Sequence, residues 1–225
     1  MTLPLSRGAI VRIVPFALFM LLLFARGNVA DDALPFDARW IYVLSVLVVG
    51  AAMAWWWREY GELDRQNLPT LREAALAVIV GAVVFVVWIK LDMKPFRIGE
   101  ATATFIPLDA QGHVIWPLVI ARWIGAALLV PVMEELFWRS FLMRWIDRAQ
   151  FETVVPAQVT FKAISLSTFV FTLAHTLWLA AIIAGLAYAW LFVRTGKLWV
   201  PIMAHGVTNG ALGVWVVATG SWGFW

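Results

Sequence analysis

Residues 131–146, with the sequence PVMEELFWRSFLMRWI, decide how the rest of the chain can be arranged. The stretch is apolar enough to lie in lipid, yet it carries Glu134, Glu135 and Arg139 within six positions. On insertion scales an ionisable side chain at the centre of a membrane costs about 2.5 to 3.5 kcal/mol. Three such side chains need partners, a water-filled cavity or both, so we treat them first as a candidate functional site.

The composition of the chain extends this apolar character to nearly its whole length. Hydrophobic residues make up 63% of the 225 positions and charged residues 14%, against about 25% charged residues in soluble domains. The sequence therefore predicts an all-α polytopic membrane protein, a bundle of transmembrane helices. Cysteine is absent, which excludes disulfides, thiolate metal sites and cysteine nucleophiles. Any chemistry must come from carboxylates, imidazoles, hydroxyls and amides.

The formal net charge of +3 does not indicate a nucleic-acid partner. Basic residues are scattered at the ends of apolar runs, where they orient membrane spans, and they form no patch. Tryptophans are also frequent near the ends of these runs, as in the aromatic belts of membrane interfaces. We therefore expect membrane lipid, and no nucleic acid, around the protein.

Apolar runs that could cross a membrane recur along the chain. A span needs about 20 mostly apolar residues, fewer at the margin. The candidate spans are residues 10–25, 40–57, 74–90, 116–146, 161–176, 178–193 and 198–218. This predicts seven spans, with eight possible, and a tight turn near His175 because no polar loop separates the fifth and sixth runs. The fourth run is too long for one perpendicular crossing, so it must tilt, project from the membrane or bend at Pro131.

The distribution of charge predicts a cytoplasmic N-terminus. Arg7 and Arg12 precede the first run, whereas the loop after it is acidic, with Asp31, Asp32 and Asp37. The basic loop before the fourth run is the exception, because it would lie outside. No internal repeat, soluble domain or low-complexity linker interrupts the chain, so we expect one membrane domain.

The acidic pair in EELFWR predicts two different roles. Glu135 and Arg139 are four residues apart, with the acid before the base, and on a helix they can pair along one face. Glu134 is turned by about 100° from its neighbour and lacks that partner. One carboxylate is compensated and one is available to act as a base. The Glu135–Arg139 pair alone is more often structural than catalytic, which leaves Glu134 as the residue hardest to explain without a function.

Two further polar pairs with the same spacing follow in apolar segments. Phe171 and His175 are four residues apart in FTLAH, and His205 and Asn209 are four apart in HGVTN. An aromatic ring can fix the orientation of a histidine, and His205 with Asn209 could supply two converging donors to an oxyanion. Each pair also has a structural interpretation, a packed core histidine in the first case and hydrogen bonds between helices in the second.

Taken together and in order, these residues resemble the type II CAAX prenyl endopeptidase and bacteriocin-processing superfamily, the CPBP or ABI family of glutamic intramembrane proteases. The family pattern is EExxxR, then FxxxH, then HxxxN or a close variant, on successive membrane helices. The chain has each of these positions: Glu134, Glu135, Arg139, Phe171, His175, His205 and Asn209. The run RTGKLWVPIMAH at residues 194–205 is also similar to the lead into the family's last motif. The resemblance covers roughly residues 116–215. The sequence around EELFWR is also similar to that of a bacterial subgroup of the family associated with exosortase or exopolysaccharide systems.

The resemblance implies an intramembrane glutamic endopeptidase without a metal or other cofactor. Glu134 would act as general base on a water together with His175, and His205 with Asn209 would stabilise the oxyanion. The remaining motif residues would support the site: Glu135, Arg139 and Phe171.

The resemblance also implies a membrane-associated peptide or protein as substrate and a location in the bacterial inner membrane. Residues 1–115 would form N-terminal transmembrane helices and loops, and residues 116–219 the catalytic helical core of one integrated domain. Substrate identity, prenylation of the substrate and oligomeric state stay open.

Two alternatives use the same residues. Two glutamates and two histidines could ligate zinc or two irons, although the spacing lacks the HExxH or repeated ExxH arrangement of such sites. A non-enzymatic protein, either a proton-coupled transporter with Glu134 and the histidines as a relay or an immunity or scaffold partner, would also place acids and histidines in the membrane. The absence of a repeat and the small number of spans disfavour the transporter.

Overall fold

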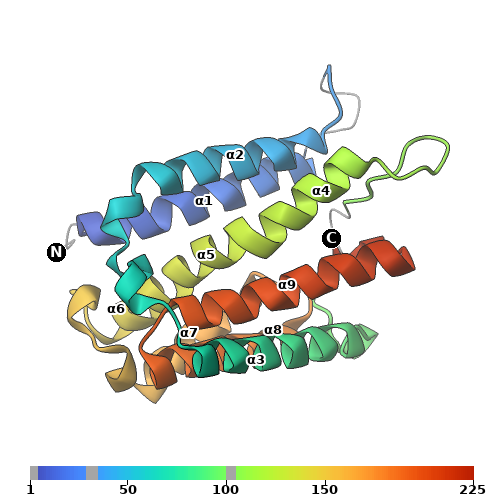
Figure 1. The fold of residues 1–225 in the computed structure, drawn as a ribbon. Coiled ribbons are helices and arrows are strands. Elements are labelled where there is room, and N and C mark those ends of the chain that lie inside the picture. Colours follow the sequence, from blue (N-terminus) through green and yellow to red (C-terminus); the bar gives the residue numbers. More distant parts are fainter. Residues whose placement is uncertain (1–4, 29–34, 100–104) are drawn as a thin grey trace.

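The computed structural model describes residues 5–28, 35–99 and 105–225 of the chain. In these residues the regular elements are helices, and the long ones lie side by side as a bundle (Figure 1). This confirms the expected all-α fold. Asp31 and Asp32, which carried part of the orientation argument, lie outside the described residues.

The N-terminal part of the bundle consists of three long helices and short 3₁₀ turns. These helices are α1 (Arg7–Asn28), α2 (Trp40–Trp55) and α3 (Leu71–Lys90). The first turn of α3 carries a capping box, in which Thr70 accepts from the Glu73 N–H and Glu73 accepts from the Thr70 N–H.

The fourth apolar run forms one continuous helical segment, Trp116–Asp147. It consists in order of α4 (Trp116–Ile124), a π-helical segment (Gly125–Leu129), α5 (Val130–Glu135), a second π-helical segment (Leu136–Met143) and α6 (Arg144–Asp147). The chain then forms α7 (Phe161–Leu173), α8 (Trp178–Thr195) and α9 (Trp199–Thr219). Residues 174–177 make the tight turn between α7 and α8 that the sequence predicts.

Within the described residues, five helical segments are long and apolar enough to cross a membrane: α1, α3, Trp116–Asp147, α8 and α9. The apolar helices α2 and α7 have 16 and 13 residues. At 1.5 Å per residue they span about 24 and 20 Å, less than the roughly 30 Å of a hydrocarbon core. Every expected run is therefore helical, but the count of seven or eight spans is not confirmed.

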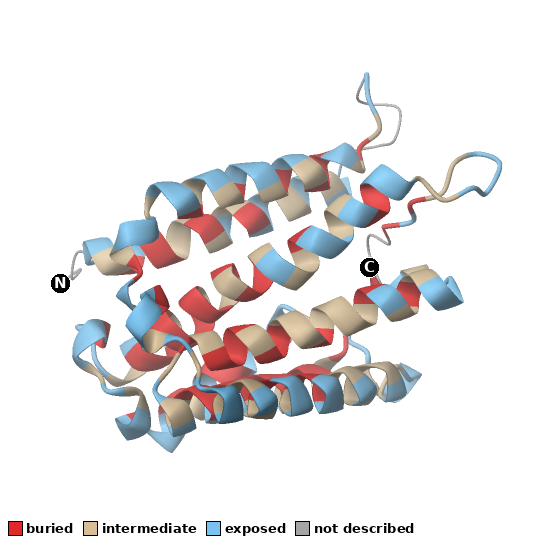
Figure 2. Cartoon of the chain, viewed as in Figure 1, coloured by how far each residue is buried: buried red, intermediate tan, exposed pale blue. Residues whose placement is uncertain are grey.

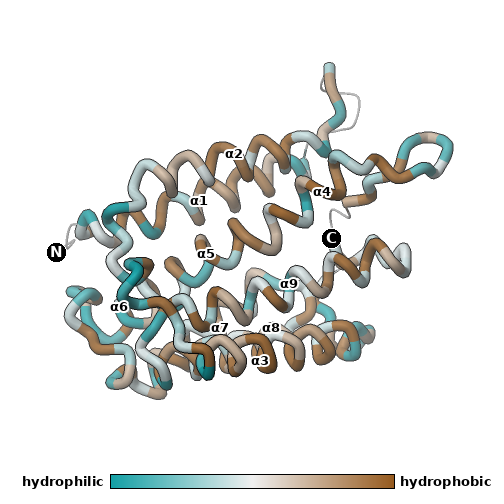
Figure 3. The backbone as a smooth tube through the Cα atoms, in the orientation of Figure 1, coloured by the Kyte–Doolittle hydropathy of each residue, from teal (hydrophilic) through white to brown (hydrophobic). Residues whose placement is uncertain are grey.

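The outward faces of the bundle are apolar. Figure 2 shows exposed residues along the outer sides of α2 and α3, and Figure 3 shows these helices to be largely hydrophobic. Leu47, Ile79 and Leu128, for example, are 65%, 61% and 65% exposed. Extended apolar surface of this kind would be a liability in water and suits a lipid environment. The chain is an integral membrane protein.

The helices α3 and α9 approach closely at Gly81. A Cβ atom at this position would press on the carbonyl oxygen of Ala204 and lie 2.9 Å from Cβ of Val207. The hydroxyl of Thr208 is 2.9 Å from the carbonyl oxygen of Gly81 and accepts from Tyr188 Oη at 2.7 Å. A small residue and a hydroxyl thus join three helices, as is common in membrane bundles.

A polar network ties α1 to the long helix at the end of the bundle where the N-terminus lies. Arg12 is buried and donates to Glu62 Oε2 at 2.6 Å and to Ser140 Oγ at 2.9 Å. Arg144 donates to Glu62 Oε1 at 2.7 Å, and Ser140 also donates to Glu62. Burial would raise the pKa of Glu62, but Arg12, Ser140 and Arg144 together hold it below its usual value.

Candidate active site

The helix that carries the two glutamates has a non-standard backbone. In the π-helical turn before α5, the N–H of Val130 donates to the carbonyl of Gly125, five residues back. The next bond of this kind would join Pro131 to Ala126, but proline has no N–H. The amide nitrogen of Asn209 donates to this carbonyl of Ala126 at 2.9 Å. The bend expected at Pro131 is thus replaced by a π-helical turn inside a continuous helix. The carbonyl that Pro131 leaves without a donor accepts from a side chain of α9.

Glu135 is the compensated carboxylate. It is fully buried, and its Oε1 accepts from Arg139 Nη1 at 3.1 Å and from His205 Nδ1 at 3.0 Å. The Arg139 guanidinium lies over the rings of Phe171 and Tyr188, 4.8 and 5.5 Å from their centroids. The predicted pairing of Glu135 with Arg139 is confirmed. The bond to His205 was not expected, because the sequence placed that histidine with Asn209.

Glu134 is the carboxylate left available. Its Oε2 atom is buried and has no hydrogen-bond partner. The Oε2 atom of Glu135 also lacks a partner, but the other oxygen of Glu135 accepts from two cationic or potentially cationic side chains. A buried polar atom without a partner is costly, which in Glu134 indicates a place for a water or a substrate group.

His175 lies beyond the end of α7, in the turn before α8, and not on the helix as the spacing suggested. Its ring still lies against Phe171, with centroids 4.3 Å apart, and the edge of Trp88 packs on it at 5.6 Å. The Nδ1 atom is 2.8 Å from the Phe171 carbonyl oxygen. A carbonyl can only accept, so Nδ1 carries a hydrogen and Nε2 of the neutral ring is an acceptor. The contact with Phe171 therefore leaves Nε2 of the neutral His175 ring as a hydrogen-bond acceptor.

His205 is held from two sides. Its ring stacks on Tyr188 at 5.0 Å, with 21° between the ring planes, and its Nδ1 faces Glu135. Because the Glu135 oxygen also accepts from Arg139, Nδ1 is the donor of this bond. The Nε2 atom can then donate to an oxyanion when the ring is protonated.

The proposed catalytic residues meet at one cavity of about 260 Å³. Five of the seven motif residues line it: Glu134, Phe171, His175, His205 and Asn209. The other two, Glu135 and Arg139, lie buried behind it. The structure thus brings together residues from α5, α9 and the turn after α7, which the sequence placed on successive helices.

Sequence reasoning missed several parts of this site. Tyr188 supports His205, and Trp88 covers His175. Helices α1 and α3, which carry no motif, also line the cavity through Met20, Leu23 and Trp88. The sequence contained one hint of these residues, Tyr188, which is a polar aromatic residue in a largely apolar helix. The contribution of α1 to the cavity wall depends on helix packing, which the spacing of residues in the sequence does not predict.

The metal alternative requires a set of ligands. In the parts of the chain that the structure describes, no group of three or more histidine, aspartate or glutamate side chains is arranged to hold a metal ion. Oε1 of Glu135 accepts from Arg139 and His205, whereas Oε2 of Glu134 has no partner.

The fold and this cavity define a class, a helical integral membrane protein with two acids and two histidines at or beside one largely apolar cavity. Residues 116–211 match the family model described as type II CAAX prenyl endopeptidase Rce1-like. The matched segment begins at α4 and ends within α9, and the match supports the CAAX protease family that its motif residues resemble. The family consists of proteases, which supports a peptidase at the level of the family. No curated protein and no solved structure gave a significant match.

Proposed function

We propose that the protein is an intramembrane glutamic-type endopeptidase that hydrolyses a peptide bond of a membrane-associated substrate. The observation that carries the proposal is the buried, unpartnered oxygen of Glu134 in the cavity that His175, His205 and Asn209 also line. The family match at residues 116–211 supports the reaction class.

In the proposed reaction Glu134 removes a proton from a water that Nε2 of His175 orients. The water oxygen bonds to the carbonyl carbon of the scissile peptide, and the carbonyl oxygen becomes an oxyanion. His205 Nε2 and the second N–H of Asn209 stabilise this charge. The proton on Glu134 then passes to the departing amine nitrogen as the C–N bond breaks, which completes hydrolysis.

Glu135 and Arg139 act as positioning residues. Glu135 accepts from the Nδ1 side of His205, which leaves Nε2 available to the cavity that the ring lines. Arg139 offsets the buried charge of Glu135 and packs on Phe171, which fixes His175. The supporting residues therefore connect His205 with His175 through Glu135, Arg139 and Phe171.

We extend the proposal to the membrane arrangement. α2 and α7 run along the same bundle as the five longer helices (Figure 1), so we propose that both also cross, which gives seven spans around one domain. Basic residues near the N-terminus favour a cytoplasmic start, and the resemblance favours the bacterial inner membrane.

A comparison of peptide termini in cells tests the function. Membrane and exported proteins from cells that produce the wild-type protein should contain cleavage products that are missing with Glu134→Gln. The matched control is Asp64→Asn, because Asp64 is exposed and outside the cavity. Identical termini with wild type and Glu134→Gln would refute the proposal. Proton uptake into liposomes that depends on Glu134, without cleavage, would favour the transporter.

A further inference from the structure

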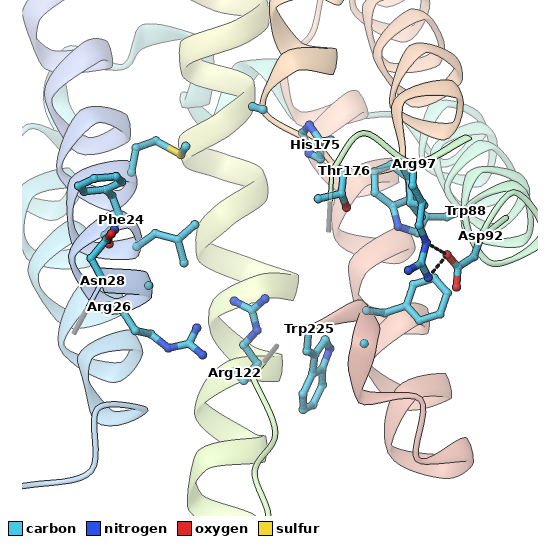
Figure 4. A pocket seen from close by; sticks show the side chains of 18 residues that line it. Phe24, Arg26, Asn28, Trp88, Asp92, Arg97, Arg122, His175, Thr176 and Trp225 are labelled. Atoms are coloured by element: carbon cyan, nitrogen blue, oxygen red, sulfur yellow. Dashed lines mark hydrogen bonds and ion pairs between the residues drawn. The ribbon is translucent and has the colours of Figure 1, made fainter. Parts of the chain in front are cut away.

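A second, larger cavity of about 770 Å³ adjoins the candidate active site (Figure 4). The two cavities share wall residues from α1, α3, α4, the turn after α7 and the C-terminal residues, among them Met20, Trp88, Arg122 and His175. A molecule in the larger cavity could therefore lie next to His175, which both cavities share.

Among the described residues, two arginines of this cavity have no acidic side chain bonded to them. Arg26 of α1 and Arg122 of α4 both reach into the space near Trp225 (Figure 4). In the described part of the chain neither forms an ion pair or a side-chain hydrogen bond, and the buried Nε atom of Arg122 has no partner. Asp37 interacts electrostatically with Arg26, but its carboxylate accepts from Arg39.

The two guanidinium groups are close to each other. Both lie over the ring of Phe105, 5.0 Å from its centroid for Arg26 and 5.8 Å for Arg122. Arg122 also lies 4.4 Å from the centroid of the Tyr42 ring. Aromatic faces compensate such charges only in part. Two neighbouring cations in a largely apolar protein therefore leave a place for an anion.

A third arginine of the same cavity provides a contrast. Arg97 is hydrogen-bonded through its guanidinium to Asp92, so its charge is already compensated (Figure 4). Within the described residues, the cavity thus contains one arginine paired with an acid and two that are not.

We propose that Arg26 and Arg122 bind a carboxylate of the peptide substrate and so position its backbone toward Glu134. Guanidinium groups bind carboxylates through paired, charge-assisted hydrogen bonds. Apolar residues of the same cavity wall, including Met20 and Leu23, suit apolar substrate side chains. The two cavities share wall residues, so a molecule bound at the arginines can extend to the proposed reacting centre. This favours the peptide substrate over a lipid as the ligand. This inference rests on the proposed endopeptidase function.

Binding of a matched pair of peptides to the full-length protein tests the site. The probes are dansyl-Leu-Leu-Leu with a free carboxylate and the same peptide as its amide, measured by fluorescence anisotropy in phosphatidylcholine nanodiscs. We expect the acid to bind about tenfold tighter or more, the gain typical of a charge-assisted bond. Arg26→Gln and Arg122→Gln should lose this preference, and the matched control Arg97→Gln should keep it.

Three results would overturn the inference. The first is equal binding of acid and amide to the wild-type protein, and the second is an equal loss of the preference for the acid in Arg97→Gln. The third is stabilisation of the protein by phosphatidylglycerol that needs Arg26 and Arg122 and displaces the acid peptide. The last would identify a lipid phosphate as the ligand. The comparison of acid and amide needs only wild-type protein, so it stands even if a variant fails to fold. It also requires no turnover, so its failure is distinct from a failure of the cleavage test.

Discussion

Asn209 joins backbone structure and proposed chemistry in one side chain. One of its N–H groups satisfies the Ala126 carbonyl that Pro131 leaves without a donor. The other is free for an oxyanion in the cavity that Asn209 lines. The residue therefore has a structural role beside the catalytic one that the family resemblance implies, and a single alanine substitution would remove both.

A double variant separates the two roles. Asn209→Ala should lower cleavage about 100- to 1000-fold through loss of an oxyanion donor and destabilise the protein by about 1 to 3 kcal/mol through an unpaired carbonyl. Adding Pro131→Ala restores an N–H to the helix, so thermal unfolding in detergent should show recovered stability while activity stays low. Activity that recovers together with stability would reduce Asn209 to a structural residue.

The residue-level chemistry was only partly predictable from the sequence. The spacing of Glu135 and Arg139 predicts their pair because both lie on one helix, and the same reasoning leaves Glu134 available. The bond between Glu135 and His205 crosses helices 70 positions apart in sequence. Helical spacing contains no information about such a contact, so the sequence paired His205 with Asn209 alone.

At the scale of elements, the long helix Trp116–Asp147 depends on features that hydrophobic pattern does not encode. The pattern predicted one long run and a disturbance at Pro131, but not the π-helical segments on either side of α5. π-helical turns are frequent at functional sites, and here they flank the two glutamates. The sequence predicted a turn near His175 but still placed this histidine on the helix of Phe171, because the segment is apolar on both sides of the turn.

The contact between α3 and α9 allows a test of element packing. Gly81→Ala should destabilise the protein by about 1 to 3 kcal/mol, because the new methyl group has no space beside Ala204 and Val207. Gly61→Ala is the matched control, since a Cβ atom there meets nothing within 4 Å. Thermal unfolding in nanodiscs measures both. Equal stability of the two variants would contradict the close approach of these helices.

At the scale of the whole molecule, the composition was sufficient to predict an all-helical membrane bundle, because helices satisfy their backbone groups internally in lipid. The number of crossings was not predictable to the same degree. α2 and α7 are apolar but short, and whether a short helix crosses depends on its neighbours and on local membrane thickness. The role of α1 in the cavity wall likewise arises only from the assembled bundle.

The network around Glu62 makes overall stability depend on pH. Its pKa is lower in the folded protein than in the unfolded chain, so the ionised carboxylate stabilises the fold above the unfolded value of about 4.3. This contribution should be lost as the pH falls through the folded pKa. At pH 7 the melting temperature of Glu62→Gln should be lower than that of the wild type. Between pH 7 and pH 3 the melting temperature of Glu62→Gln should fall less steeply than that of the wild type. Parallel pH profiles would show that Glu62 does not carry this dependence.

The most direct measurement of the central claim is single-turnover cleavage by purified protein in nanodiscs, with a peptide taken from the termini comparison. Wild type and Glu134→Gln would be compared at equal folded fraction, so that a loss of structure cannot imitate a loss of chemistry. Removal of a general base should slow cleavage by about 100- to 10,000-fold. A Glu134→Gln rate equal to that of the wild type would contradict the assignment of Glu134 as the base.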